Sequence, residues 1–293
     1  MTLQEHPSMR AQSVNGTRRI LRRIANEIAQ LPGIRRLAQP FYQRLFVRQF
    51  FGANSYCGAW QTFAEAKASA PQVLPSSYET AAAGSMYRTE LERITVSDYP
   101  VLYWLSRLLA DGQHHLFDLG GHIGVKYYAF QRYLQYPQAL RWIVHDVPAV
   151  VAAGRQYAAE HDSQRHLDFA TSPEQASGCD ALLSTGALQY LDYTLPALLA
   201  RLPQRPRHVL VNLTPMHPVR SYFTLQHIGI AICPYRVSAV PEFTAAIQAL
   251  GYELVDQWAS LERNVRVPFH PECDIDRYHG FYFRRIQDTQ FGG

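Results

Sequence analysis

Between residues 115 and 214, short apolar segments alternate with helical segments, and this alternation constrains the fold more than any other feature. The helical segments cover 124–135, 148–161 and 194–202. The apolar segments have the length and composition of strands and cover 115–120, 140–147, 166–170, 179–185 and 208–214. Strands that alternate with helices predict a mostly parallel sheet covered on both faces, which is an α/β fold.

The end of the chain follows a different pattern. A long segment, 215–241, comes after the last of these strands, and a helix is expected over 242–250. Two further strand candidates, 251–261 and 279–286, are then joined by a loop that contains no helix. Parallel strands need a crossover connection, so this pair predicts an antiparallel hairpin at the edge of the sheet.

Composition places the chain among folded proteins. It has 293 residues, of which 47% are hydrophobic and 18% are charged, enough for one large domain or for a domain with an appended segment. No apolar run approaches the roughly 20 residues that cross a bilayer, and no secretory signal is evident. Four widely spaced cysteines without a CxxC pair favour free thiols in a reducing cytoplasm.

Positive charge is concentrated at the start of the chain. Residues 1–50 hold nine arginines and two glutamates, whereas the whole chain has a net charge of +4. We interpret residues 1–100 as a basic, helical extension or cap and residues 101–293 as the main domain. The sequence does not indicate an oligomeric state.

Within this extension, residues 15–31 predict an amphipathic helix with isoleucines on one face. Its basic residues are Arg18, Arg19, Arg22 and Arg23. A basic amphipathic helix can lie on an anionic membrane surface, which would place the protein at the inner face of the membrane. The alternative is a cap that packs on the main domain and leaves its arginines in water.

The stretch "DLGGHIG", 118–124, joins the first strand to the first helix of the alternating region. Gly120, Gly121 and Gly124 allow positive φ angles and a close approach of a ligand to the backbone. The N–H groups at the start of the next helix can then face a polar group. The nicotinamide fingerprint GxGxxG is not met, which disfavours a nicotinamide-dependent oxidoreductase.

Acidic residues follow the strands around this turn. Asp118 ends the first strand and Asp146 the second, where a carboxylate can hold ribose hydroxyls. Asp168 and Phe169 lie at the third strand, where they could contact an adenine. Each aspartate alone is equally consistent with a strand-end cap. Together they predict a nucleotide-like ligand at the carboxyl edge of the sheet.

The segments "FDLGGHIG", "VHDVPAVV", "CDALLSTGALQYL" and "FFGANSYCGAWQTFAEA" resemble class I S-adenosylmethionine-dependent methyltransferases. The chain is most similar, over residues 45–286, to an uncharacterised bacterial family often linked to cell-surface polysaccharide genes. This resemblance implies a doubly wound, Rossmann-like sheet of seven strands that ends with a reversed strand. It also implies S-adenosylmethionine as cofactor and O-methylation of a small-molecule or lipid-linked saccharide acceptor.

The resemblance also implies roles for individual residues. It places Asp146 at the ribose, Asp168 and Phe169 at the adenine, and Thr185 opposite the sulfonium. The methionine and ribose end would be lined by Asp118, Gly120, Gly121 and Gly124. Two residues depart from the pattern: His122 replaces a glycine common in the turn, and Gln189 stands where small-molecule O-methyltransferases carry a catalytic histidine.

Because glutamine cannot act as a general base, a base must come from elsewhere or the acceptor needs none. The segment 215–241 follows the fifth strand on the cofactor side and could cover the acceptor. It offers His227 as the first candidate, His217 as the second, and Tyr222. Each of them could instead be an ordinary packed or surface residue. The stretch 270–279 matches no zinc-ligand spacing, so no metal is expected.

Two further classes compete with the enzyme. The chain could be a catalytically silent binding or scaffold protein on a methyltransferase fold, with His122 and Gln189 as the disabling changes. A nucleic-acid methyltransferase is disfavoured, because the positive charge is confined to the N-terminal arm and no "NPPY"-type tetrapeptide is present. We therefore expect no nucleic-acid partner.

Overall fold

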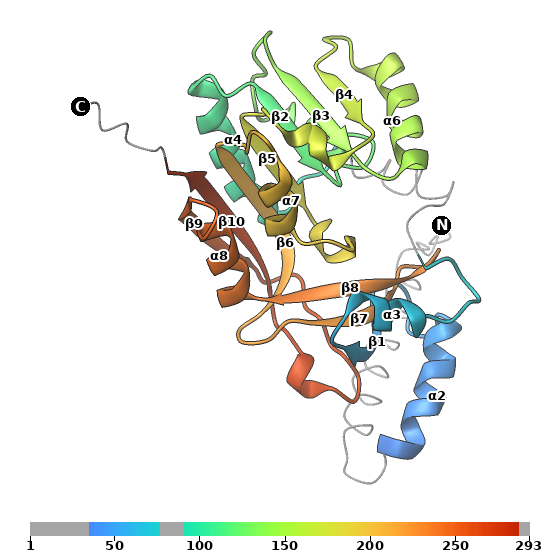
Figure 1. Ribbon diagram of the computed structural model, residues 1–293. Coiled ribbons are helices and arrows are strands. Elements are labelled where there is room, and N and C mark those ends of the chain that lie inside the picture. Colours follow the sequence, from blue (N-terminus) through green and yellow to red (C-terminus); the bar gives the residue numbers. More distant parts are fainter. Residues whose placement is uncertain (1–34, 77–90, 287–293) are drawn as a thin grey trace, which may run out of the picture.

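A sheet of seven strands forms the centre of the molecule (Figure 1). The computed structural model describes residues 35–76 and 91–286. Five strands run parallel, in the order β4-β3-β2-β5-β6. They are β2 (His115–Leu119), β3 (Arg141–His145), β4 (Leu167–Ala170), β5 (Ala181–Thr185) and β6 (His208–His217). The expected parallel α/β sheet is confirmed.

The two closing strands form the predicted antiparallel pair. Strand β10 (Tyr278–Arg285) runs antiparallel to both β6 and β9 (Tyr252–Ser260) and lies between them. The last strand of the chain is therefore inside the sheet, and β9 forms the edge. This order, with one reversed strand, is the doubly wound, Rossmann-like arrangement that the resemblance implies for class I methyltransferases.

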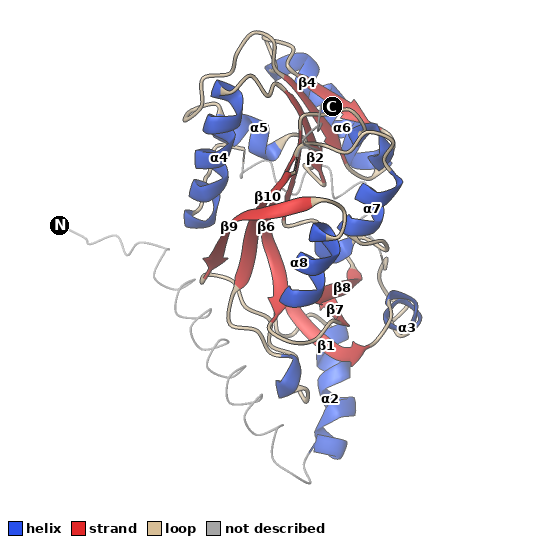
Figure 2. Cartoon of the chain, turned by 60° about the vertical axis from the view of Figure 1, so that its left-hand side comes forward, coloured by secondary structure: helices blue, strands red, loops and turns tan. Residues whose placement is uncertain are grey.

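Helices cover both faces of this sheet (Figure 2). Helices α4 (Tyr99–Ala110) and α5 (Val125–Phe130) lie on one face, and α7 (Leu195–Arg201) and α8 (Val240–Gln248) lie on the other. Helix α6 (Pro148–His161) joins the α4 side, because its Val151 packs in the same cluster.

Alternation along β2 shows why two apolar layers form. Leu116 packs among the residues of α4 and α5, whereas its neighbour Phe117 packs against α7 and α8. Both side chains are at most 1% exposed. Successive side chains of a strand point to opposite faces, so a strand buried on both sides needs apolar residues on both, and Asp118 is the buried exception in β2. Burial of each apolar side chain contributes roughly 1.5–3 kcal/mol.

Three further strands form a smaller antiparallel sheet, which we call the accessory sheet. Its order is β1-β7-β8, and β8 also pairs with the end of β6 through Met216 and His217. The strands are β1 (Ser55–Trp60), β7 (Tyr222–His227) and β8 (Ile232–Ala239). The described chain thus has ten strands in one continuous sheet, three more than expected.

The accessory sheet corrects the expectation of a wholly helical extension and assigns strands to a segment that the sequence analysis left without any. The segment 215–241 forms most of it, and β1 comes from the first 100 residues, which are therefore not wholly helical. Helices α2 (Arg35–Val47) and α3 (Phe63–Ala68) accompany β1 (Figure 1). Helix α3 begins with a capping box in which Thr62 and Glu65 exchange hydrogen bonds.

Helix α4 begins at Tyr99, just before the expected start of the main domain at residue 101. The predicted amphipathic helix over 15–31 lies outside the described residues. No helix of the described ranges is both long enough and apolar enough to span a bilayer. The four cysteines are buried free thiols.

Candidate functional site

The order of the parallel strands reverses direction at β2 and β5. The chain moves outward from β2 through β3 to β4, and then returns to β5 on the other side of β2. The connections on the two sides run over opposite faces, and it is at the carboxyl ends of such strands, here β2 and β5, that open α/β sheets form a crevice. Open α/β sheets bind ligands in this crevice. We call it the switch point.

The glycine turn that follows β2 lies at the switch point and is tightly packed. Gly120 has φ +75°, and a Cβ there would lie 2.1 Å from the Cβ of Ala187 in the loop after β5. A Cβ on Gly121 would lie 2.5 Å from the carboxylate of Asp118. Side chains at these two positions would therefore collide with neighbouring residues, which is the physical reason for glycine here.

His122 occupies this turn in a left-handed conformation, with φ +57°. For a residue other than glycine this conformation costs roughly 1–2 kcal/mol. Its backbone N–H donates to Oδ2 of Asp146 at 3.0 Å, while Oδ1 accepts from the N–H of Val147 at 2.8 Å. Asp146 therefore joins the turn to the end of β3 and offsets the strain at His122.

Asp146 still has room for a ligand. A carboxylate has about four acceptor positions, and the two backbone bonds occupy two of them. Burial raises the pKa of Asp146, while the bonds from Val147 and His122 lower it. The remaining lone pairs are those the sequence assigned to ribose hydroxyls, and that role stays a prediction.

Asp118 is the most unusual group at the switch point. Its side chain is 1% exposed, and Oδ2 accepts a hydrogen bond from Nε1 of Trp142 at 3.2 Å. Its other oxygen, Oδ1, has no hydrogen-bond partner within the described chain. Burial raises the pKa of Asp118 to about 7, against the opposing effects of the Trp142 bond and the charge of Lys126. A buried carboxylate oxygen without a partner is costly and indicates a missing donor.

Two other polar atoms near the same crevice also lack partners in the described residues. They are Oγ1 of Thr185, at the end of β5, and Oε1 of Gln189, in the 3₁₀ helix η5 (Leu188–Tyr190). The amide of Gln189 is held in place, because its Nε2 donates to the carbonyl of Gly186 at 2.8 Å. Unpartnered acceptors therefore lie on both sides of the switch point.

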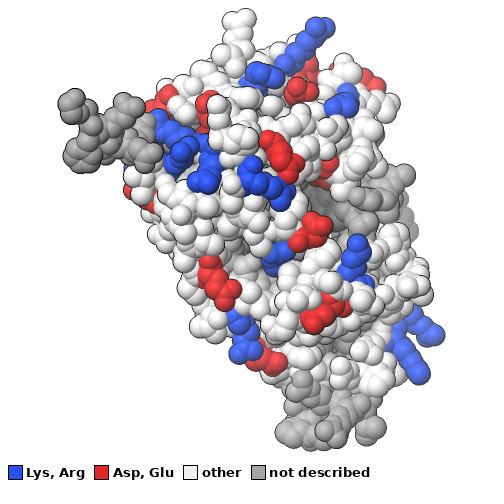
Figure 3. Space-filling model, viewed as in Figure 1, with Lys and Arg blue, Asp and Glu red and all other residues white. Residues whose placement is uncertain are grey.

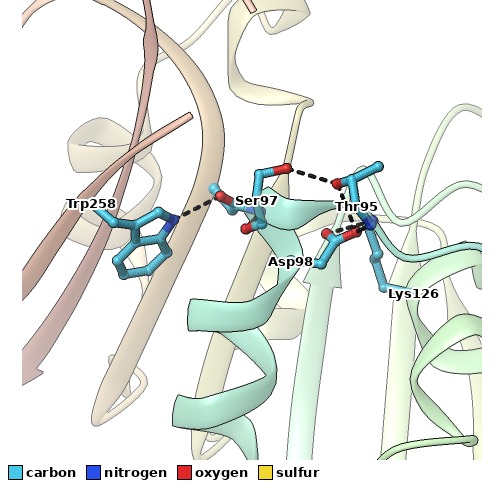
Figure 4. Close-up of polar contacts among 6 residues, drawn as sticks. Thr95, Ser97, Asp98, Lys126 and Trp258 are labelled. Carbon is cyan, nitrogen blue, oxygen red and sulfur yellow. Dashed lines mark hydrogen bonds and ion pairs between the residues drawn. The ribbon is translucent and has the colours of Figure 1, made fainter. Parts of the chain in front are cut away.

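A second buried carboxylate, Asp98, lies at the entrance to α4 and was not anticipated from the sequence. It is fully buried, forms an ion pair with Lys126 of α5 at 2.7 Å, and accepts bonds from the N–H and Oγ1 of Thr95 (Figure 4). The pattern Thr95-x-x-Asp98 is a capping signature that a search of the sequence could have found. The pairing with Lys126 depends on the tertiary fold.

This arrangement also connects α4 to the sheet. The carbonyl of Ser97 accepts a hydrogen bond from Nδ2 of Asn212 in β6 at 3.0 Å, and Oδ1 of Asn212 accepts from Nε1 of Trp258 in β9 at 3.0 Å (Figure 4). The entrance to α4 is thereby fixed against β6 and β9, beside the crevice.

The structure does not favour the expected role of Phe169 at an adenine. Phe169 is 5% exposed and lies in the core cluster beneath α6. A Cβ on Gly154 would be 2.3 Å from its ring, so the ring fills the space that this glycine leaves. Asp168 beside it is exposed, and its Oδ1 accepts from the N–H of Phe169 at 2.7 Å. Asp168 remains available to a ligand, whereas Phe169 is a core residue.

The connection between β7 and β8 reaches the glycine turn. Ile230 in this connection packs against a cluster formed by Leu91, Ile123 and Val150. Ile123 belongs to the glycine turn, and Val150 lies in the first turn of α6. The segment 215–241 therefore contacts the rim of the switch point, on the side where the sequence predicted a cover.

Each of the three candidate bases has a hydrogen bond within the described chain, although Nε2 of His227 is buried and has none there. Nδ1 of His227 accepts from the N–H of Gly229, and Nδ1 of His217 accepts from the N–H groups of Val219 and Arg220. The hydroxyl of Tyr222 donates to the carbonyl of Cys273. Burial lowers the pKa of both histidines. These contacts occupy the hydroxyl of Tyr222 and one nitrogen of each histidine, and the catalytic roles of His227, His217 and Tyr222 stay predictions.

A chain of hydrogen-bonded side chains joins the accessory sheet to η5. The hydroxyl of Tyr190 donates to Oε1 of Gln226 at 2.6 Å, and Nε2 of Gln226 donates to the hydroxyl of Tyr56 at 3.2 Å. Tyr56, Tyr278 and Tyr235 continue the chain at 3.2 and 2.6 Å. Their partners are far apart in the sequence, so no local pattern could have predicted the chain.

The stretch 270–279 is held by ion pairs. Arg266 contacts the carboxylates of Asp274 and Asp276, and His270 lies 3.3 Å from Glu272. Within the described ranges no group of three potential metal ligands comes together.

No protein-family model matches this chain, and no curated protein matches its sequence. Solved structures resemble it. Magnesium protoporphyrin IX methyltransferase from Synechocystis PCC 6803, crystallised with S-adenosylhomocysteine, matches with a TM-score of 0.46 and 13% identity, over 71% of this chain and 96% of that one. Mitomycin 7-O-methyltransferase matches with a TM-score of 0.43 and 16% identity, over 77% of this chain and 61% of that one.

A glycopeptide N-methyltransferase with bound S-adenosylhomocysteine matches with a TM-score of 0.45 and 12% identity, over 71% of this chain and 98% of that one. Because these identities are low, what this chain binds has to be inferred from its own residues. The strand order and the reversed strand show a Rossmann-like methyltransferase fold.

Proposed function

We propose that the protein is an S-adenosylmethionine-dependent methyltransferase. The observation that carries this proposal is the buried, unpartnered Oδ1 of Asp118 at the switch point of the sheet. A carboxylate in this position calls for a cationic or hydrogen-bond-donating ligand, and the α-ammonium group of the cofactor is such a ligand. The strand order is the second support.

The residues present fit the cofactor. Asp118 would accept the ammonium group, and the turn that contains Gly120, Gly121 and Gly124 would allow the close approach of its methionine and ribose end. The free lone pairs of Asp146 would accept from the ribose hydroxyls. The unpartnered Oγ1 of Thr185 lies at the end of the neighbouring strand, where the reacting end of the cofactor is expected.

The bound cofactor would supply a methyl group activated by a sulfonium. The chain's task is then to hold an acceptor oxygen in line and to exclude water. Gln189 suits the first task, because its unpartnered Oε1 can accept a hydrogen bond from the hydroxyl of the methyl acceptor and so orient its oxygen. The connection around Ile230 suits the second. Well-oriented groups gain up to several kcal/mol from positioning alone.

The acceptor in this proposal is a hydroxyl of a small molecule or of a lipid-linked saccharide. The acceptor oxygen would take the methyl group, the sulfur would keep the electron pair of the broken bond, and the hydroxyl proton would be lost to bulk water as the product leaves. Gln189 cannot remove that proton. This site therefore suits an acceptor that needs only correct positioning and that loses its proton after the methyl group has been transferred.

Calorimetric titration of S-adenosylhomocysteine tests the cofactor assignment. We expect micromolar binding to the wild type and a loss of at least about tenfold for Asp118→Asn, the order expected for a charged hydrogen bond. Asp180→Asn is the matched control: this carboxylate accepts two backbone bonds at the opposite, amino edge of the sheet, each of 2.9 Å. Wild-type protein that binds no S-adenosylhomocysteine would contradict the proposal.

A second candidate function is a binding or scaffold protein that keeps the cofactor site without catalysis. The observation in its favour is Gln189, which cannot act as a base, together with the backbone hydrogen bonds that occupy Nδ1 of His227 and of His217. Turnover separates the two candidates. Mass-spectrometric detection of a methylated product in saccharide or lipid extracts supports the enzyme, and cofactor binding without any product supports the scaffold.

Contact with the inner face of the membrane through the basic segment 15–31, for which the sequence predicts a helix, remains part of the proposal. Sedimentation with anionic vesicles tests it. Charge reversal of the four arginines between residues 18 and 23 should abolish binding, because each basic residue contributes about 1 kcal/mol at such a surface. Equal sedimentation of wild type and variant would rule out this contact.

A further inference from the structure

A cavity of about 410 Å³ lies between α4 and the strands β6, β9 and β10. Gln113, just before β2, and Arg207, just before β6, form part of its wall. It therefore opens at the amino ends of the parallel strands, the edge opposite the switch point. Its volume falls within the range of small-molecule sites.

Basic side chains dominate the polar part of this wall. Arg107 and Arg207 are exposed, and neither forms an ion pair with another described residue. A third arginine, Arg284, is paired with Glu253 at 2.7 Å. Asp111 is the single carboxylate among the lining residues. Two guanidinium groups are thus available to an anion.

The surface around the end of β10 agrees with this picture. On the face shown in Figure 3, basic and acidic side chains are interspersed over most of the molecule. Several basic ones gather beside the place where the described chain ends, after β10. Arg284 belongs to this last part of β10.

The remaining wall is apolar and partly aromatic. Leu108 and Val255 line it together with the rings of Trp104 and Tyr282, whose centroids are 4.4 Å apart. The indole of Trp104 is held in place, because its Nε1 donates to Oδ2 of Asp256 at 2.8 Å. A fixed indole beside guanidinium groups can pack against a planar ligand.

His208 forms an uncharged part of the inner wall. Its Nδ1 lies 2.8 Å from the hydroxyl of Tyr282. Burial and the charges of Arg207 and Arg284 lower the pKa of His208 to about 4, despite the opposing effects of Asp180 and Asp111. At neutral pH the imidazole is therefore uncharged and serves as a polar wall, and the arginines supply the charge.

We propose that this cavity binds a small aromatic phosphate, with the phosphate on Arg107 and Arg207 and the ring against Trp104. Two unpaired guanidinium groups match a dianion, and bidentate contacts between arginine and phosphate are among the strongest hydrogen bonds in proteins. This site is separate from the switch point and does not depend on the proposed methyltransferase activity.

Calorimetric titration with phenyl phosphate tests the proposal, with inorganic phosphate as the second probe. We expect phenyl phosphate to bind the wild type about tenfold more tightly than inorganic phosphate, because only the former reaches the apolar wall. The double variant Arg107→Gln/Arg207→Gln should lose at least about tenfold in affinity for phenyl phosphate. Both arginines are exposed, so this change should leave the fold intact.

Two controls make the result decisive. Arg132→Gln/Arg201→Gln removes the same charge away from the cavity and should bind phenyl phosphate as the wild type does. Asp118→Asn should also bind it normally, because that residue lies at the opposite edge. Absence of binding to the wild type, equal losses in both double variants, or loss in Asp118→Asn would overturn the proposal. Equal affinity for the two probes would overturn the aromatic part of it.

Discussion

Two buried carboxylates near the start of α5 differ in one respect. Asp98 is fully buried and has three hydrogen-bond donors, two from Thr95 and one from Lys126. Asp118 is almost equally buried, yet one of its oxygens has no partner within the described chain. A carboxylate whose partners are all in the protein stabilises the fold. One that lacks a partner stabilises the complex with a ligand, at a cost to the free protein.

The largest expected effect concerns Asp98. Asp98→Ala leaves the ammonium group of Lys126, whose side chain is 16% exposed, without its carboxylate. We expect a loss of about 3–5 kcal/mol in the free energy of unfolding, as for other broken buried ion pairs, measured by urea denaturation. Glu253→Ala breaks an exposed pair with the same 2.7 Å separation and should cost about 1 kcal/mol or less. Equal losses in the two variants would contradict the assigned role of Asp98.

Asp118 should make the free protein less stable as the pH rises. Its pKa of about 7 in the folded protein lies above the value of about 3.9 expected for an unfolded chain, so the folded state holds the proton more tightly. Its contribution is therefore present at low pH and is lost as the pH rises toward 7 and above. Between pH 5 and pH 8 the wild type should lose about 3 kcal/mol relative to Asp118→Asn in urea denaturation. A constant difference between the two proteins would show that Asp118 is already ionised at pH 5.

The same carboxyl group should make ligand affinity depend on pH in the opposite direction. The α-ammonium group of S-adenosylhomocysteine binds the ionised form of Asp118, so protonation of this residue competes with binding. Below pH 7 the affinity should fall by about tenfold per pH unit, or roughly 2 kcal/mol in total by pH 5.5. Asp118→Asn should show weak affinity without this dependence. Calorimetry at several pH values measures this affinity for both proteins. If the affinities of wild type and Asp118→Asn change in parallel with pH, Asp118 does not bind the ammonium group.

The smallest expected effect concerns Thr185, which extends the comparison between partnered and unpartnered polar groups to a hydroxyl. Its Oγ1 is buried and unpartnered in the described chain, so Thr185→Val should leave the free energy of unfolding unchanged or slightly raised. The affinity for S-adenosylhomocysteine should fall by about 1 kcal/mol, the net value of one neutral hydrogen bond. Ser184→Ala is the matched control, because this hydroxyl donates to the carbonyl of Leu119 at 2.9 Å and stabilises the fold instead. Loss of stability in Thr185→Val would show that the Thr185 hydroxyl stabilises the fold, as the Ser184 hydroxyl does.

The main sheet could be predicted because its signal is local. Apolar runs such as 115–120, the helix over 148–161 and the loop between the last two strands each leave a pattern within a few residues. The accessory sheet leaves no such pattern. Strand β1 pairs with β7, which lies far away in the sequence. The composition of residues 215–241 therefore predicts neither that this segment forms strands nor which strand it pairs with.

The candidate site could be predicted only in part, because some of its contacts join residues that are far apart in the sequence. Asp118 and the glycines of the turn stand together in the chain, so their meeting at the end of β2 was predictable. The ion pair of Asp98 with Lys126 joins residues 28 positions apart through the packing of two helices. His227 was the first candidate base on the sequence, and the structure shows it 1% exposed with its Nδ1 accepting from the N–H of Gly229.

The pairing of β1 with β7 has a consequence for the synthesis of the chain. Tyr56 and Gln226, which meet in this pair, are separated by 170 residues. At roughly 5–20 residues per second, a ribosome needs about 10–30 seconds to produce the partner after β1 has been made. During this interval β1 lacks β7, the strand that pairs with it in the folded protein. In a nascent chain of this protein, β1 therefore stays exposed for several seconds, which gives chaperones time to bind it before the accessory sheet can form.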